Sequence, residues 1–559
     1  ADILTGDVNP SGHLTDTYAE ALEDYPSTAG FHESTDYVDY TEDIYVGYRY
    51  FETIPGARQK VVYPFGYGLS YSDFLIRPTF AQKAGGQIVL NAQVTNLSEM
   101  PGKQVVQVYA KLPQAKLGKP RLTLVSFAKT GLLGMGCAQT LDLSFPLSRL
   151  ASYDDTGRVK KSAWILEEGS YELYIGDSAE NLDRVPFDWH VSETIVIEQL
   201  SEKAAPRKLR KRMLSDGSFE DLPTGEYPVR KLGLEPQKDV LNDFSTPYVP
   251  ARGGHPFESL SESDGRIRLE DVADGAYTLD QFTDQLTDDE LIALLGGQPN
   301  TGVANTFGFG NNEAYGIPDV MTADGPAGLR VWEQTGVTTT AWPVASLLAC
   351  SWDCDLLFRV GQAGGREVRE NNIGIWLTPA VNIHRSPLCG RNFEYYSEDP
   401  LVAGLLAGAM VRGIQSEGVG ASVKHFCANN KETNRRESDS RVSERALREI
   451  YLKAFELIVK REKPLTIMSS YNLLNGTHTS ENKDLLTGIL RDEWGFDGAV
   501  TTDWWTTGEH YLEAKAGNDI KMASGHPERV KEAYEKGLIS REEILTCAGR
   551  VLKMILKLD

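Results

Sequence analysis

The chain has 559 residues, of which 41% are hydrophobic. This length exceeds what one small core can organise, so about two to four domains are expected. The formal net charge of −22 argues against nucleic acid as a partner, because contacts to phosphates need clustered Lys and Arg. No apolar run approaches the roughly 18 to 20 residues of a membrane span, and no secretory signal opens the chain. The six cysteines form no CxxC pair, which favours free thiols in a reducing compartment. We therefore expect a cytoplasmic protein without a nucleic-acid or membrane partner.

Residues 1–74 do not resemble the start of an independently folding domain. They open on ADILTGDVNPSG, with neither a Met nor a leading strand or helix, and continue through Gly-, Pro- and Tyr-rich stretches such as DIYVGYRYF and YPFGYGLSY. Such a segment has too few apolar positions for a separate core. We expect it to pack on another domain, one that lies outside this chain.

Short alternating runs such as QIVLNAQVTN and KQVVQVYAKL fill residues 75–200. Strands at this spacing, divided by Gly, Pro and Asn turns, are typical of an antiparallel β-sandwich of immunoglobulin or fibronectin type. Residues 201–275 are rich in Pro, Gly, Lys and Asp without a sustained period. They are predicted to be a surface linker, in which the basic run 207–212 is solvated.

From residue 276 onward, the pattern alternates between strand and helix. Capping boxes at Thr287/Glu290 and Ser540/Glu543 precede apolar runs and predict helix starts. Between them lie buried-looking strands, each followed by a polar loop: IPDVMTADGPAGLR, NIGIWLTPAVNIHR, GASVKHFCANN, PLTIMSSYN and GAVTTDWW. The length suits a single (β/α)₈ barrel of the TIM type, so the predicted fold class is α/β plus β.

The ends of these strands carry the candidate chemistry. In such a barrel the reactive groups stand where strands end, so Asp503, directly after the last of these strands, is a candidate catalytic residue rather than a surface charge. Charged and aromatic residues follow the other strands: Asp324, Arg330, Arg391, Glu394, Lys424, His425, Arg435, Met468, Tyr471 and Trp504.

Metal and cofactor sites lack support in the sequence. His425 has no second His or Cys at ligand spacing, and neither GxGxxG after a strand nor GxxxxGK[ST] occurs. No metal and no cofactor is therefore expected. A phosphate-binding barrel is harder to exclude, but facing carboxylates such as Asp324 and Asp503 would repel a phosphate and suit a neutral polyol.

The strings DGPAGLR, GRNFEYYSEDP, KHFCANNKETNR, IMSSYN and TTDWW, in this order, closely resemble glycoside hydrolase family 3, the β-glucosidase group. GDVNPSG and YPFGYGLSY are similar to the end of that family's α/β-sandwich domain, which its fibronectin-like domain follows. The barrel comes last, the reverse of the commoner order, and the upstream part of the α/β-sandwich domain would be absent from this chain. The implied domains are a remnant of the α/β-sandwich domain (1–74), a fibronectin type III-like domain (75–200), a linker (201–275) and the catalytic barrel (276–559).

The resemblance implies a role for each matching residue. Asp503 matches the nucleophile that forms a covalent glycosyl-enzyme. The residues that match those holding the sugar hydroxyls in subsite −1 are Asp324, Arg330, Arg391, Lys424, His425 and Arg435. The residues that match the walls of this subsite are Met468, Tyr471 and Trp504. Retaining hydrolysis requires an ionised carboxylate, so we expect neighbouring cations to keep the pKa of Asp503 low.

Retaining hydrolysis also needs an acid/base group about 5 to 5.5 Å from the nucleophile. In this family it is a Glu on the α/β-sandwich domain, upstream of the segment that matches ADILTGDVNPSG, so we do not expect it in this chain. The branch of N-acetylglucosaminidases uses a His on a barrel loop, but KHFCANNKETNR departs from its pattern. Local carboxyls without a motif are the other candidates: Glu42, Glu52, Glu432 and Glu437.

The implied function is a retaining exo-β-glucosidase that releases terminal β-D-glucose from a β-glucoside or cello-oligosaccharide. Asp324, placed for the O4 and O6 side of the ring, favours glucose over xylose. A β-xylosidase or an enzyme of mixed specificity stays open, as does a sugar-binding fragment that lacks the acid/base. Whether the chain forms a homo-oligomer is also open.

Overall fold

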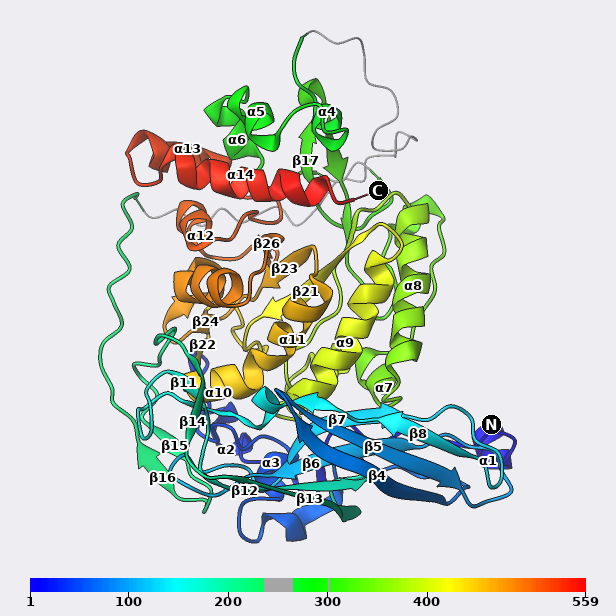
Figure 1. Ribbon diagram of the computed structural model, residues 1–559. Helices are drawn as coiled ribbons and strands as arrows, with labels where there is room; N and C mark the ends of the chain where they lie inside the picture. Colours follow the sequence, from blue (N-terminus) through cyan, green and yellow to red (C-terminus); the bar gives the residue numbers. More distant parts are fainter. Residues whose placement is uncertain (236–264, 300–301, 559) are drawn as a thin grey trace.

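The computed structural model describes residues 1–235, 265–299 and 302–558. Two antiparallel sheets form a sandwich at the base of the molecule in Figure 1. One sheet has the order β4-β5-β8, and the other has the order β13-β12-β6-β7. Their strands are β4 (Phe74–Ala84), β5 (Gln87–Asn96), β6 (Val105–Lys111), β7 (Thr123–Lys129), β8 (Ala138–Asp142), β12 (Gly169–Gly176) and β13 (Leu182–Val191). Alternate residues of β5 from Ile88 to Val94 are fully buried between the sheets, as the alternating pattern predicts. The predicted fibronectin-like sandwich is confirmed.

A curled parallel sheet forms the centre of the C-terminal half. Its order is β19-β20-β21-β23-β26, and bridges of Thr501 to Ile520 and of Lys521 to Gly296 continue it around the ring. The antiparallel hairpin of β17 and β18 departs from a regular barrel. The bounds are β17 (Phe309–Asn312), β18 (Ile317–Val320), β19 (Thr322–Ala323), β20 (Ile375–Trp376), β21 (Gly420–Phe426), β23 (Thr466–Ser469) and β26 (Ala499–Thr502). The predicted barrel fold is confirmed.

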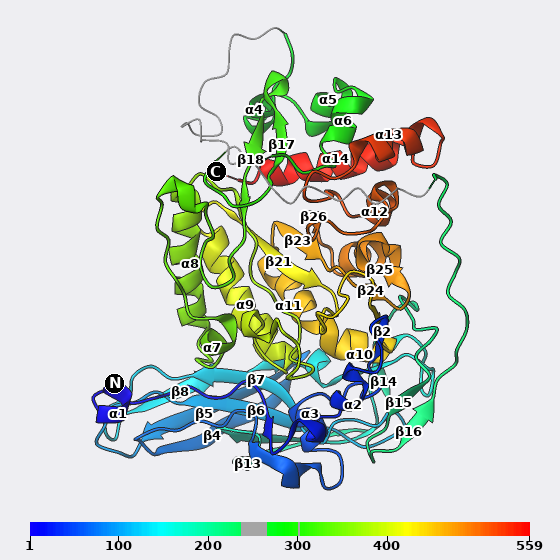
Figure 2. The same ribbon diagram turned by 180° about the vertical axis from the view of Figure 1, so that it is seen from behind.

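Helices cover the outside of this sheet (Figures 1 and 2). Helix α9 (Pro400–Gln415) packs against α8 (Cys354–Glu370) and α11 (Lys453–Glu462). The predicted capping boxes are present: Thr287 begins α6 (Asp288–Ala293) and Ser540 begins α14 (Arg541–Ile555). Each hydroxyl accepts a hydrogen bond from the third backbone N–H of its helix, which satisfies a donor that the helix cannot.

The N-terminal segment packs on the barrel. Strand β2 (Tyr37–Asp39), labelled in Figure 2, pairs in parallel with β22 (Asp439–Arg441), about four hundred positions later in the chain. Buried side chains of the segment, such as Tyr40 and Tyr48, belong to the same hydrophobic core as the barrel helices. The expectation that this segment needs another domain is therefore correct. The barrel supplies part of the surface for this segment, while Leu4, Tyr18 and Leu69 of the segment stay exposed.

The predicted linker contains regular structure. Strands β15 (Lys211–Met213) and β16 (Phe219–Asp221) form an antiparallel hairpin. The basic run is not wholly solvated, because Arg212 is buried and paired with Asp155 (2.9 Å) and Glu220 (2.7 Å). Residues 236–264 of the predicted linker lie outside the described residues, and α4 (Leu269–Ala273) follows them.

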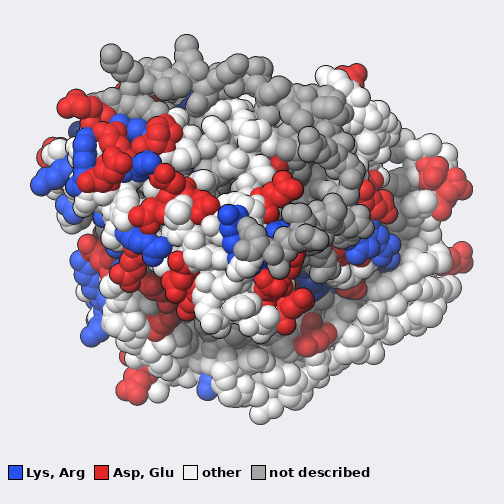
Figure 3. All heavy atoms as spheres, turned by 90° about the horizontal axis from the view of Figure 1, so that it is seen from above, with Lys and Arg blue, Asp and Glu red and all other residues white. Residues whose placement is uncertain are grey.

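Charges of both signs are interspersed on the face at α13 (Pro527–Glu535) and α14 (Figure 3). Ion pairs such as Lys531 with Asp289 (2.9 Å) and Arg541 with Asp288 (2.8 Å) join neighbouring helices there. Within the described ranges, we find no helix with the length and apolar character to cross a membrane.

Candidate active site

The carboxyl ends of the barrel strands bring five predicted site residues to one edge of the sheet. Asp324 follows β19, Lys424 and His425 lie in β21, Met468 lies in β23 and Asp503 follows β26. Neighbouring parallel strands end at the same edge, which explains how residues far apart in sequence meet. The residues of β21, β23 and β26 are all buried, so their backbones form a rigid base.

Asp503 presents an unusual carboxylate. Its side chain is only 11% exposed. Oδ1 accepts a hydrogen bond from the backbone N–H of Trp504 (2.8 Å), but Oδ2 is buried and has no hydrogen-bond partner in the described part of the chain. The nearest nitrogen of a basic side chain is Nε2 of His425, which lies 3.8 Å from Oδ2. Buried polar atoms are nearly always paired, so this oxygen is poised to meet an external group.

The pKa of Asp503 is raised, contrary to the expectation from the sequence. Burial raises it above 3.8, and the charges of Arg391, Lys424 and Arg435 oppose this shift without cancelling it. The three cations are less effective than expected because each has a closer acidic partner, which for Arg435 is Glu432 (3.1 Å). Arg391 forms an ion pair with Glu394, and Lys424 forms one with Asp324.

His425 is held as a neutral imidazole. Burial lowers its pKa well below 6.5, and the charges of Arg391 and Lys424 lower it further. The backbone N–H of His425 donates to Oδ1 of Asn382 (2.9 Å), and the amide of Asn382 donates back to the His425 carbonyl (2.9 Å). Asn382 was not among the sequence candidates. Its place in the polar loop after β20 is the signal that could have identified it.

Asp324 and Lys424 form a charged pair beside this centre. Nζ of Lys424 lies 2.8 Å from Oδ1 of Asp324, and Arg330 approaches Oδ2 at 3.4 Å. Burial would raise the pKa of Asp324, but Lys424 and its hydrogen bond outweigh burial and lower the pKa to about 2. Asp324 therefore stays ionised. Arg330 is mostly exposed and lies at the rim.

Aromatic and apolar side chains line the other side. Tyr471, Met468 and Trp504 are buried, and the Arg435 guanidinium lies 4.4 Å from the centroid of the Tyr471 ring. Burial and the charge of Asp503 raise the pKa of Tyr471, so its phenol remains protonated. An aromatic face with a hydroxyl donor suits the mixed apolar and polar surface of a sugar ring.

Three of the four local carboxyls named in the sequence analysis form ion pairs with arginines. Glu42 is fully buried against Arg385, Glu432 pairs with Arg435 (3.1 Å), and Glu52 lies 3.5 Å from Arg58. Glu437 is exposed and lies 4.0 Å from His478. Among the described residues, no group of three or more His, Cys, Asp or Glu is placed to hold a metal ion.

The site thus combines a buried carboxylate, a neutral imidazole, ionised pairs and aromatic walls at the carboxyl edge of a parallel barrel. This combination defines a hydrolase-type site for a polyhydroxylated substrate.

Family models match in three places. The glycosyl hydrolase family 3 C-terminal domain matches residues 1–71, a fibronectin type III-like domain matches 104–179, and the glycosyl hydrolase family 3 N-terminal domain matches 307–554. The chain belongs to glycoside hydrolase family 3 and is a glycoside hydrolase. The order of the models confirms the predicted reversal of domains.

Two curated relatives match nearly the whole chain. "Beta-glucosidase A" of Butyrivibrio fibrisolvens is 53% identical over 97% of this chain and 68% of its own length. "Beta-glucosidase" of Ruminococcus albus is 38% identical over 100% of this chain and 59% of its own length. The crystal structure of a β-glucosidase from Paenibacillus barengoltzii is 39% identical, with a TM-score of 0.89 over 100% of this chain and 63% of that one. The chain therefore spans roughly two thirds of these relatives.

Proposed function

We propose that this chain carries the sugar-binding half of a retaining exo-β-glucosidase and that Asp503 is its nucleophile. The observation that carries the proposal is the buried, unpartnered Oδ2 of Asp503 at the edge where the charged and aromatic residues converge. Relatives that match nearly the whole chain are named as β-glucosidases. This supports a β-glucoside or cello-oligosaccharide as substrate.

In the proposed reaction, Oδ2 of Asp503 attacks the anomeric carbon, and the bond from that carbon to the leaving oxygen breaks. The leaving oxygen takes a proton from a general acid. Water then attacks the same carbon and gives its proton to the conjugate base of that acid, and the bond to Oδ2 breaks and returns the carboxylate. The ionised Asp324 and Lys424 would bind ring hydroxyls, and hydrogen bonds that tighten in the transition state would accelerate the first step.

We assign the general acid to none of Glu42, Glu52, Glu432 and Glu437, because the first three are engaged in ion pairs with arginines and Glu437 is an exposed side chain beside His478. A good leaving group needs little protonation, so comparing 4-nitrophenyl β-glucoside with cellobiose tests this point. Turnover of the nitrophenyl substrate alone means that this chain lacks the acid, and turnover of both means that it contains one. Turnover of neither, with glucose still bound, supports the sugar-binding alternative. Nitrophenyl β-xyloside in the same assay tests the xylosidase alternative.

The nucleophile is tested by Asp503→Asn, with Asp497→Asn as the matched control. Asp497 is exposed and shortly precedes the same strand. We expect Asp503→Asn to lower kcat for nitrophenyl β-glucoside by roughly 10³-fold or more and Asp497→Asn to leave it unchanged. NMR of the first sugar anomer released should give the β form. Undiminished turnover by Asp503→Asn, or release of the α anomer, would overturn the proposal.

A further inference from the structure

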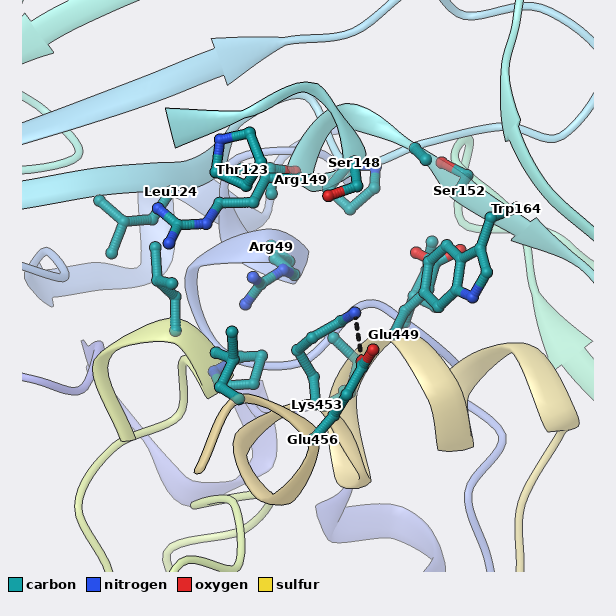
Figure 4. A pocket seen from close by; sticks show the side chains of 18 of the residues that line it. Arg49, Thr123, Leu124, Ser148, Arg149, Ser152, Trp164, Glu449, Lys453 and Glu456 are labelled. Atoms are coloured by element: carbon teal, nitrogen blue, oxygen red, sulfur yellow. Dashed lines mark hydrogen bonds and ion pairs between the residues drawn. The ribbon is translucent and has the colours of Figure 1, made fainter. Parts of the chain in front are cut away.

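A cavity of about 460 Å³ lies where the sandwich, the N-terminal segment and the barrel helices meet. Its walls come from β7, the turn η3 (Leu147–Leu150), α3 (Tyr48–Phe51), α9 and α11 (Figure 4). No residue of the candidate active site lines it. Its size is within the range of about 300 to 1,000 Å³ that is usual for small-molecule sites.

Most of the wall is apolar. Leu112, Leu124, Pro146, Leu401 and Leu457 contribute aliphatic surface, and Trp164 contributes an aromatic side chain. Such a lining favours an apolar ligand body, because water is displaced from both surfaces on binding.

Arg49 places a buried guanidinium in the wall of this cavity. Its side chain is only 6% exposed, and Nη2 donates to Asp399 at 2.7 Å. Nη1 is buried and has no hydrogen-bond partner within the described ranges. This nitrogen is shielded from solvent, so the Arg49 guanidinium acts on the cavity through its charge rather than through this N–H.

Arg149 supplies a cation that has no carboxylate in direct contact and only the more distant charge of Asp399 to offset it. Nη1 donates to the carbonyl of Val125 (2.7 Å), while Nε is buried without a partner among the described residues. Burial and the charge of Arg461 lower the pKa of Arg149 to about 10, so it is still cationic at neutral pH. In the part of the chain that the structure describes, no carboxylate lies within 4.0 Å of this guanidinium.

The carboxylates that line the cavity are already paired. Glu456 accepts from Lys453 (2.6 Å) and Lys460 (2.7 Å), and the first of these bonds is drawn in Figure 4. Glu449 pairs with Arg445 (3.0 Å). Neither carboxylate neutralises Arg149, so the cavity favours an anion.

We propose that this cavity binds a small organic anion, with its carboxylate or phosphate at Arg49 and Arg149 and its apolar body against Leu112, Leu124 and Leu401. The ligand would contact the sandwich, the N-terminal segment and the barrel helices at the same time. Binding would therefore stabilise their packing and raise the midpoint of thermal unfolding.

The test uses the full chain and four probes of similar apolar body: 4-phenylbutanoate, 4-phenylbutyl phosphate, 4-phenylbutan-1-ol and 4-phenylbutylamine. Calorimetric titration should show saturable binding of at least one anion, at least about tenfold tighter than the alcohol and the amine. The two anions distinguish a carboxylate ligand from a phosphate ligand. Equal binding of the alcohol, or no saturable binding of either anion, would overturn the proposal.

Variants test whether the anion binds in this cavity. Arg149→Gln should weaken the preferred anion by about tenfold or more, and Ser148→Phe should block it by filling the mouth without removing an arginine. Arg77→Gln, at an exposed position of β4, is the matched control and should bind as the native chain does. Asp503→Asn should also bind normally, which separates this cavity from the proposed catalytic site. Unchanged affinity in both Arg149→Gln and Ser148→Phe would refute the assignment.

Discussion

Replacing Glu42 with Gln should detach the N-terminal segment from the barrel. Glu42 and Arg385 form a bidentate ion pair, with Nε at 2.5 Å and Nη2 at 2.9 Å from the carboxylate oxygens. Both side chains are 1% exposed. The substitution keeps the volume but leaves the Arg385 charge buried without a counter-ion, which costs about 3 to 5 kcal/mol.

This free energy can be measured as a local opening. A loss of about 3 kcal/mol raises the open fraction by roughly 10²-fold when opening is fast relative to cleavage. We therefore expect thermolysin to cleave within residues 1–74 of Glu42→Gln roughly 10²-fold faster than in the native chain. Mass spectrometry of the fragments identifies the sites of cleavage.

Two matched variants serve as controls for the loss of the buried ion pair. The double variant Glu42→Gln/Arg385→Met removes both charges and should recover most of the resistance. Glu172→Gln breaks an exposed pair with Lys111 (3.6 Å) and should change cleavage by less than about fivefold. Native resistance in Glu42→Gln, or a double variant that is no better than the single one, would contradict the argument.

Three further predictions concern charges at the site and in the core. Asp324→Asn releases Lys424 and should raise KM for nitrophenyl β-glucoside roughly 10- to 100-fold; an unchanged KM in initial-rate assays would refute this. Because burial raises the pKa of Asp503, the acid limb of kcat/KM against pH should lie above 3.8, and a limb below that value would be inconsistent. Burial, with the charge of Lys521, lowers the pKa of His510 from 6.5 to about 4. The stability it contributes is therefore complete above pH 6.5 and lost as pH falls toward 4. Urea unfolding should show a loss on the order of 2 kcal/mol between pH 7 and 5 that His510→Gln lacks.

The fold could be predicted because its signals are local. A buried strand that ends in polar residues, such as the run before Asp503, can be recognised from the pattern of apolar and polar residues within ten positions. In a barrel of parallel strands, these ends lie at one edge. The placement of Asp324 beside Lys424 follows from the same rule. These contacts depend on the topology of parallel strands rather than on details of packing.

Other features depend on long-range contacts that no local pattern encodes. Glu42 was considered as a substitute acid, but its buried pair with Arg385 becomes visible only when the N-terminal segment is docked. The raised pKa of Asp503 likewise reflects burial, and sequence reasoning counted the nearby cations but not their own partners. Asn382 was missed because it holds the backbone of His425 rather than a substrate.

The pairing of β2 with β22 has a consequence for biosynthesis. A ribosome must add residue 441 before the strand at Tyr37–Asp39 can find its neighbour, and closing so large a loop is slow. During translation, the tyrosine-rich segment that contains β2 therefore waits without the barrel surface on which it packs and exposes apolar side chains such as Tyr40 and Tyr48. Nascent chains stalled before this point should engage chaperones more strongly than chains stalled after it.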